Sequence, residues 1–280
     1  MRIAFVSPYE QHPLDYQWGC WRTGTDGLSS ALLLLAADGY DLKFFRGDNH
    51  AELVEEVYQW KPDVVAVWDS FLGIWGPLAR PRIPRARFVL FFGGGPIRRD
   101  DTWDLVFYES VLDGVEIQAD GMRGVRAFGT NTDLFRPMKK PKVWDAIYPA
   151  AYASWKRQID FAREYKKKGL LIGHVEEPNI KDECEKFGVM CLPWVPPWTL
   201  VEMINSSKWV HIYADKNGGC QRSVLEALAC DLPVTVPEDA PKLLELVMEY
   251  EASGLTGRAF VESRYTARHY ADAIRDGLCE

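Results

Sequence analysis

The chain has 280 residues, of which 47% are hydrophobic, and its formal net charge is -7. This length can supply one large or two medium hydrophobic cores and favours two domains. The acidic balance argues against a protein that attracts nucleic acid through its overall charge, and the longest apolar run, Ala31 to Ala37, is too short to cross a bilayer.

The N-terminus and the cysteines indicate the compartment. The first residues, MRIAFVSPYE, lack a hydrophobic region with a small-residue cleavage site, so we expect a cytoplasmic protein. The six cysteines form no CxxC pair, which favours reduced, mostly buried thiols over disulfides or a zinc site. The five histidines are equally dispersed, so we expect no metal cluster, while a loosely bound ion stays open.

The N-terminal half alternates strands and helices, which predicts an α/β domain that opens with a βαβ unit. Its glycines do not form GxGxxG, so NAD binding is disfavoured. The predicted elements are the strand Arg2 to Val6, the helix from Gly27 to near Gly39, the strand Asp41 to Phe45, the helix Ala51 to Trp60, and the strands Pro62 to Trp68, Arg87 to Phe92, Asp104 to Tyr108 and Val125 to Phe128.

Two features of this half are candidates for function. Asp69 follows a buried strand, and ligands gather at the carboxyl ends of strands in open α/β sheets, although Asp69 alternatively caps the next turn. From Ser70 to Arg99 there is no lysine or acidic residue but there are six arginines, the last two being Arg98 and Arg99. Two readings stay open: a solvated loop balanced by nearby carboxylates, or a site for an anionic partner.

The second half repeats the alternation. The predicted elements are the strand Val143 to Ala153, the helix Ser154 to Lys168, the strand Leu170 to Gly173, the helix Asn179 to Phe187, the strand Val189 to Leu192, the helix Thr199 to Ser206, the strand Trp209 to Tyr213, a helix capped by Ser223, the strand Leu232 to Val236, and the helices Ala240 to Tyr250 and Ser263 to Gly277.

Two places in this half predict anion binding. Lys156 and Arg157 lie in the expected first turn of a helix that Ser154 would cap, where positive charge opposes the helix dipole unless an anion is bound. Gly218 and Gly219 precede a second short helix, so backbone amides and a positive helix N-terminus face one loop. An exposed basic turn and an ordinary strand-to-helix turn are the respective alternatives.

Two stretches resemble one family. GGCQRSVLEALACDLPV, residues 218–234, resembles the donor-binding segment of retaining glycosyltransferases of the GT-B fold, in which a helix reading EAxAxGxPV carries a Glu that binds the ribose of a nucleotide sugar. FGTNTDLFRP, residues 128–137, is similar to the segment NGVDTxxFxP that leaves the N-terminal domain of that family. An acidic residue of the family pattern, eight positions before the Glu, is replaced here by Gly218.

The resemblance implies an α/β fold of two Rossmann-like domains that face each other across a cleft. Residues 1–130 would be the acceptor domain, residues 131–262 the nucleotide-sugar domain, and residues 263–280 a helix that packs back on the first domain. The boundary lies just before the basic linker MKKPK. The donor is then a cosubstrate such as a UDP- or GDP-hexose, with no tightly bound cofactor and no required metal.

The resemblance also assigns roles to residues. Lys156 and Arg157 would stabilise the diphosphate leaving group, with Asp69 orienting the acceptor; because the departing phosphate can accept the acceptor proton, no catalytic base is needed. Donor contacts would come from Glu226 at the ribose and from the residues Gly218, Gly219, Cys220, Gln221, Arg222, Trp194 and Val195. Trp194 either stacks on the base or fills the core. Acceptor contacts are expected from Asp26, Arg98 and Arg99.

The acceptor is open between several classes. The compact length, the spellings SWKRQ and GGxxRxVLEAxAC and the arginine-rich segment 80–99 resemble phage enzymes that glycosylate 5-hydroxymethylated pyrimidines in double-stranded DNA, in the cytoplasm of the host cell. An envelope-glycan or small-molecule acceptor is the alternative. A sugar-nucleotide-binding protein without transferase activity, or a GT-B epimerase, is an alternative of another class. The sequence gives no indication of oligomeric state.

Overall fold

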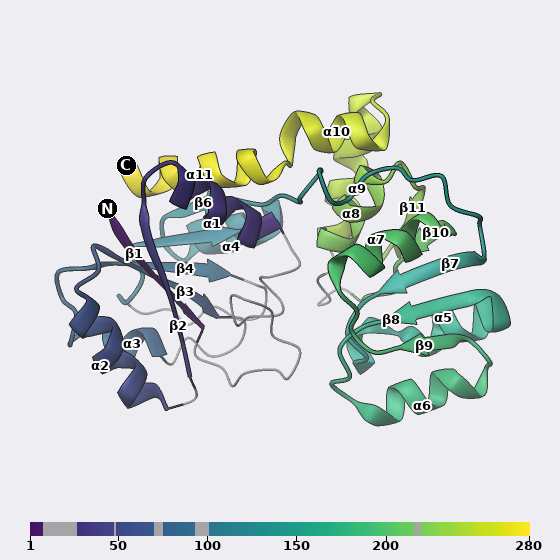
Figure 1. Ribbon diagram of the computed structural model, residues 1–280, viewed down its shortest axis with the longest axis horizontal. Coiled ribbons are helices and arrows are strands. Elements are labelled where there is room, and N and C mark those ends of the chain that lie inside the picture. Colours follow the sequence, from purple (N-terminus) through teal and green to yellow (C-terminus); the bar gives the residue numbers. More distant parts are fainter. Residues whose placement is uncertain (8–26, 48, 70–74, 93–100, 216–218, 220) are drawn as a thin grey trace. The chain divides into compact units, whose positions relative to one another are not determined.

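The computed structural model describes residues 1–7, 27–47, 49–69, 75–92, 101–215, 219 and 221–280, except for the side chain of Asp69. It divides the chain into two compact units, residues 1–128 with 267–280 and residues 129–266 (Figure 1). The chain therefore passes between the units twice, after Phe128 and after Thr266. Among the described residues, no helix is both long and apolar enough to span a bilayer.

The N-terminal unit is built on a six-stranded sheet in the order β2-β1-β3-β4-β5-β6, with every pair of neighbours parallel. Its strands are β1 (Arg2–Ser7), β2 (Asp41–Arg46), β3 (Val64–Asp69), β4 (Arg87–Phe92), β5 (Leu105–Tyr108) and β6 (Gly124–Arg126). Strands β1 and β4 are buried along nearly their whole length, as expected for a parallel sheet that is covered on both faces.

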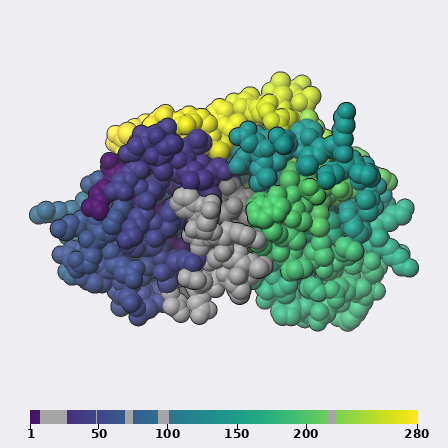
Figure 2. All heavy atoms as spheres, in the orientation of Figure 1, coloured from purple at the N-terminus to yellow at the C-terminus, as the bar shows by residue number. Residues whose placement is uncertain are grey.

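Helices cover both faces of this sheet. One apolar cluster joins the sheet to α2 (His50–Trp60), α3 (Trp75–Ala79) and α4 (Val111–Ala119). The other joins it to α1 (Gly27–Ala37) and to the last helix, α11 (Ala267–Cys279). Figure 2 shows α11 in yellow lying against the purple N-terminal segment that contains α1.

The C-terminal unit has a second parallel sheet in the order β11-β10-β7-β8-β9. Its strands are β7 (Trp144–Pro149), β8 (Gly169–Ile172), β9 (Met190–Leu192), β10 (Ser207–His211) and β11 (Val234–Thr235). Its helices are α5 (Gln158–Tyr165), α6 (Pro178–Lys186), α7 (Pro197–Asn205), α8 (Gln221–Ala229), α9 (Pro241–Ser253) and α10 (Gly257–Arg264), with short 3-10 turns at Ser154–Lys156 and Lys166–Lys168. The predicted α/β class is confirmed.

Several predicted elements were wrong in detail. Helices α3 and α4 were not predicted, because short helices leave little periodic signal. The predicted strand up to Ala153 ends at Pro149, and the predicted helix from Ser154 is interrupted at Arg157, which has a left-handed φ of 50°. The predicted helix from Ser263 is two helices, since α10 ends at Arg264.

Neither serine predicted as an N-cap has that role. Ser154 lies in the 3-10 turn, where its hydroxyl donates to the Glu177 carboxylate at 3.0 Å. Ser223 is the third residue of α8, and its hydroxyl donates to the carbonyl of Pro149 at 2.9 Å. Both hydroxyls are used to join segments distant in sequence, which local capping rules do not detect.

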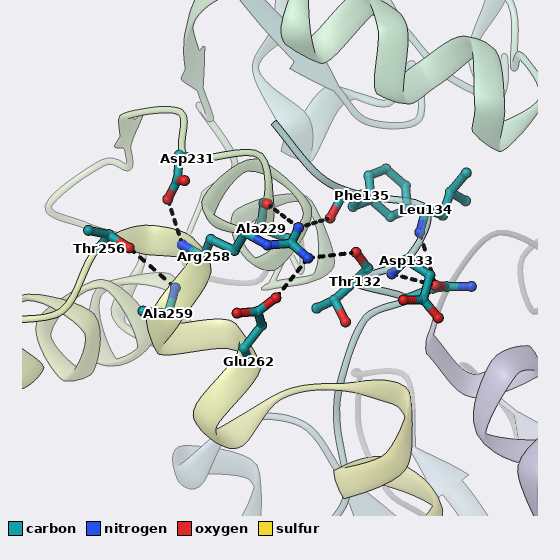
Figure 3. A network of polar contacts seen from close by, with 11 residues as sticks. Thr132, Asp133, Leu134, Phe135, Ala229, Asp231, Thr256, Arg258, Ala259 and Glu262 are labelled. Atoms are coloured by element: carbon teal, nitrogen blue, oxygen red, sulfur yellow. Dashed lines mark hydrogen bonds and ion pairs between the residues drawn. The ribbon is translucent and has the colours of Figure 1, made fainter. Parts of the chain in front are cut away.

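The segment that opens the C-terminal unit is fixed by Arg258 of α10 (Figure 3). Its guanidinium donates to the carbonyls of Thr132 and Phe135 at 3.3 Å each and of Ala229 at 3.4 Å, and it pairs with Glu262 at 2.7 Å. One side chain thus ties residues 132–135 to the end of helix α8.

Candidate functional site

Three loops of the C-terminal unit meet at the carboxyl edge of its sheet. They follow β7, β10 and β11. The backbone N–H of Asp215, after β10, donates to the carbonyl of Trp155, after β7, at 3.0 Å. Lys156 and Arg157 make the other links, described next. In open α/β sheets this edge is where ligands bind, so the loops form the candidate site.

The two predicted cations contact different loops. Lys156 Nζ donates at 2.7 Å to the carbonyl of Gly219, two residues before the start of helix α8. Tyr148 fixes the Lys156 backbone by donating its hydroxyl to the Lys156 carbonyl at 2.9 Å. Arg157 is bound by Asp239, after β11, through bonds of 2.6 and 3.0 Å. The 3-10 turn Ser154–Lys156 ends at Arg157, whose backbone is left-handed, so the turn ends between Lys156 and Arg157.

The Arg157–Asp239 ion pair is bidentate, and it shifts the pKa of both side chains. Hydrogen bonds from Arg157 lower the pKa of Asp239, and the reciprocal bonds raise the pKa of the Arg157 guanidinium. The charge of Arg157 is therefore largely balanced within the protein by Asp239.

Helix α8 carries the predicted donor residues. Gln221 is its first residue, Arg222 is half-buried, and Glu226 is buried in its second turn with only 3% of its surface exposed. Helix α10 packs closely against α8, since a Cβ added to Gly257 of α10 would lie 2.7 Å from the carbonyl oxygen of Leu228. Its nine residues direct a positive N-terminal end toward the loop that Lys156 contacts.

The predicted donor residues Trp194 and Val195 follow β9, at the carboxyl edge of the same parallel sheet. Both are half-buried in the loop between β9 and α7. Asp69 is the last residue of β3 in the N-terminal unit, where its backbone pairs with Phe92. The predicted residues Asp26, Arg98, Arg99, Gly218 and Cys220 lie outside the described residues.

Two described arginines of the arginine-rich segment are paired with carboxylates of the same chain, and a third is bound by a backbone carbonyl. Arg80 binds Asp104 through bonds of 2.5 and 3.0 Å, and Arg82 binds Glu55 at 2.9 Å. Arg87 Nη1 donates to the carbonyl of Leu278 at 2.8 Å and so anchors α11. These contacts favour the interpretation of a solvated, internally balanced segment over an anion site for this part of the segment.

Asp104 is held ionised by these contacts. Burial alone would raise its pKa, but hydrogen bonds from Arg80 and from the backbone N–H of Phe88, at 2.7 Å, lower the pKa overall. The carboxylate therefore joins the arginine to the start of strand β4.

Sequence reasoning missed two acidic residues of the site. Asp239 holds Arg157, and Glu177 accepts the backbone N–H of Ser154 at 2.8 Å as well as its hydroxyl. Both follow strands at the same sheet edge, so the rule that carboxyl ends of parallel strands converge could have identified them.

Comparison with known proteins identifies the fold. No protein-family model and no curated protein matches the chain. Among solved structures, Anabaena HepE in complex with UDP and glucose is similar with a TM-score of 0.66 and 13% identity, covering 100% of this chain and 99% of that one. The fold is GT-B.

Other GT-B structures agree. Sucrose-phosphate synthase from Thermosynechococcus elongatus is similar with a TM-score of 0.69 and 12% identity, over 98% of this chain and 97% of that one. A trehalose-6-phosphate protein from E. coli bound with UDP-2-fluoro glucose has a TM-score of 0.68 and 9% identity, over 99% of both chains. The expected pair of Rossmann-like units is thus confirmed as the GT-B fold.

Proposed function

We propose that the chain is a glycosyltransferase that moves a sugar from a nucleotide-diphosphate sugar to a hydroxyl acceptor, with retention of configuration at the sugar. The observation that carries this proposal is the contact of Lys156 with Gly219 at the start of the helix that contains buried Glu226. UDP or a UDP-sugar bound to GT-B structures of similar fold supports the choice of donor.

Helix α8 offers groups suited to the ribose and groups suited to the diphosphate at different positions along its axis. Glu226 lies five residues after Gln221, about 7.5 Å along the helix axis. A carboxylate accepts hydrogen bonds, so Glu226 suits the ribose hydroxyls, while the helix N-terminus and Lys156 suit the diphosphate. In this assignment Arg157 acts mainly by fixing the Lys156 turn through Asp239.

The proposed reaction needs no protein base. The bond between the sugar C1 and the diphosphate oxygen breaks as the acceptor oxygen bonds to C1 from the same face. The acceptor proton passes to the departing diphosphate, whose developing charge Lys156 and the amides before α8 stabilise. Asp69 is proposed to orient the acceptor. No metal is assigned a role in this scheme.

The acceptor of the proposed transfer is a hydroxyl of one of two classes. A 5-hydroxymethylated pyrimidine in DNA was expected from the arginine-rich segment, and three of its arginines are bound by groups of the same chain. An envelope-glycan or small-molecule hydroxyl is therefore retained beside DNA in the test. Gly218, in place of the usual acidic residue, favours the second candidate function, a sugar-nucleotide-binding protein without turnover.

The test is incubation with a panel of UDP- and GDP-sugars, with duplex DNA containing 5-hydroxymethylcytosine or with small glycan acceptors, followed by mass spectrometry. A hexose-mass gain identifies the acceptor, and donor hydrolysis without such a gain keeps the transferase and discards the acceptors tried. Binding of a sugar nucleotide with neither transfer nor hydrolysis supports the binding protein; no binding of any donor overturns both.

Two variants test the site. Lys156→Ala should lower kcat by about 100-fold, because it removes a charge at the leaving group. Glu226→Gln should weaken donor binding by about tenfold or more, because the ribose loses a charged acceptor. Lys167→Ala, which removes an exposed lysine outside the site, is the matched control and should match the wild type. Wild-type kinetics in the first two variants would contradict the assignment.

A further inference from the structure

The C-terminal unit has a groove of about 440 Å³ away from the candidate donor site, within the range of small-ligand pockets. The described residues that line it are Asp145, Tyr165, Lys208, Trp209, His211 and Thr235. None of these residues lies in the loops that carry Lys156 and Gly219 or in helix α8, which carries Glu226. The groove therefore requires its own explanation.

The sheet topology explains why this surface is open. The connections through α5 and α6 run in one direction from β7, and those through α7 and α8 run in the other, so right-handed crossovers place the two pairs on opposite faces. Helix α5 contacts β7 and β8, which leaves its face of β10 and β11 without a crossover helix. Trp209 of β10 accordingly keeps 45% of its surface exposed.

The lining residues converge from three strands and one helix. Trp209 and His211 are two positions apart on β10 and share a face, and Thr235 of β11 pairs with His211. The hydroxyl of Tyr165, at the end of α5, lies 2.7 Å from His211 Nδ1. At the start of the strands, Lys208 Nζ donates to Asp145 at 2.7 Å.

The chemistry of the groove favours an uncharged ligand. The charges of Asp145 and Lys208 cancel, and burial lowers the pKa of His211 so that its imidazole is neutral at pH 7, although Glu164 lies 4.0 Å away. Lys168, at 3.5 Å, is a second and more exposed partner of Asp145. No arginine is among the described residues that line the groove, so these residues offer no bidentate phosphate contact.

The polar groups have hydrogen-bonding capacity to offer. Asp145 uses its two oxygens for lysines but can accept further bonds, because a carboxylate has about four acceptor positions. The hydroxyl of Thr235 is buried and has no partner among the described residues. An exposed indole beside such groups offers an apolar platform for the C–H face of a pyranose ring, and the polar groups lie near enough to bond its hydroxyls.

We infer that this groove is a binding site for a neutral saccharide, with a pyranose ring stacked on Trp209 and its hydroxyls bonded near Asp145 and Thr235. The site is separate from the donor site and does not depend on the proposed transferase activity. It would hold a saccharide without acting on it, since none of its residues is placed at the diphosphate.

The test is saturation-transfer NMR of the full chain with maltotriose, cellotriose and mannotriose, in excess UDP so that binding at a donor site is suppressed. Uridine and inorganic phosphate serve as other ligands. At least one trisaccharide should show transfer to its ring C–H protons. Trp209→Ala should weaken that binding about tenfold, because the stacking platform is removed, whereas Trp209→Phe should retain most of it.

The matched control is Met248→Ala, which removes a large apolar side chain of helix α9 that lies outside the groove and is more exposed than Trp209, 63% against 45%, and it should leave saccharide binding unchanged. The inference is overturned if no trisaccharide binds, if Trp209→Ala binds as the wild type does, or if phosphate or uridine is preferred over the saccharides. Circular dichroism of each variant checks that the C-terminal unit is folded.

Discussion

Replacing Arg258 with alanine should lower the free energy of unfolding of the C-terminal unit by about 2 kcal/mol. The side chain is only 26% exposed and donates to three carbonyls at 3.3 to 3.4 Å. Bonds of this length from a charged donor contribute about 0.5 to 1 kcal/mol each when carbonyls can regain water. These three bonds account for most of the expected loss.

Two further terms are smaller. Ala229 is the last residue of α8, so the Arg258 charge also interacts with the negative end of that helix, for about 0.3 to 1 kcal/mol. In the ion pair with Arg258 the Glu262 side chain is about half exposed, so the pair contributes less than about 1 kcal/mol. The main effect should therefore come from the carbonyls and not from the ion pair.

Urea unfolding followed by circular dichroism measures the loss, and hydrogen exchange of residues 129–135 shows whether that segment is released. Arg258→Lys keeps the charge but not the planar fork, and should lie between the wild type and alanine. Glu262→Gln should cost about 0.5 kcal/mol. The reasoning would be refuted if the unfolding free energy of Arg258→Ala lay within about 0.5 kcal/mol of the wild-type value. It would also be refuted if Glu262→Gln lost as much unfolding free energy as Arg258→Ala.

Three other changes test the fold. Gly173→Ala should cost more than about 3 kcal/mol in urea unfolding, because its Cβ would lie 1.8 Å from a backbone oxygen, whereas Gly254→Ala, in open space with a φ of 65°, should cost about 1 kcal/mol. The pKa of Asp104 is lowered in the folded state, so its contribution is present above pH about 4 and is lost as the pH falls through the folded value; Asp104→Asn should flatten stability measured across that range. Iodoacetamide should alkylate exposed Cys279 before Cys184, whose pKa burial raises to about 12; equal rates, read by mass spectrometry, would contradict the packing around Cys184.

The architecture was predictable because strands and helices alternate with clear apolar runs. Buried strands such as Arg87–Phe92 consist almost entirely of apolar residues, and the helix at residues 50–60 differs by one residue from its predicted start. These signals depend on local spacing, which the sequence shows directly.

Residues of the candidate site could be predicted only where a family motif specifies their position in the sequence. Lys156 was expected at the diphosphate and Gly219 beside the sugar of the donor, and the structure brings these two residues into contact. Asp239 was not expected, because its role depends on two loops meeting at the sheet edge, 82 residues apart in the chain. The left-handed conformation of Arg157 was equally hidden, since arginine gives no turn signal.

The contribution of α11 to the N-terminal unit affects how the protein is made. Tyr270, Ala271, Ile274 and Leu278 belong to the core cluster that also contains residues of β1 and α1. A ribosome releases those four residues only after it has synthesised all of residues 129–266. The contiguous C-terminal unit can therefore complete its core first, while the unit that is synthesised earlier waits for its last helix, the reverse of the usual order of cotranslational folding.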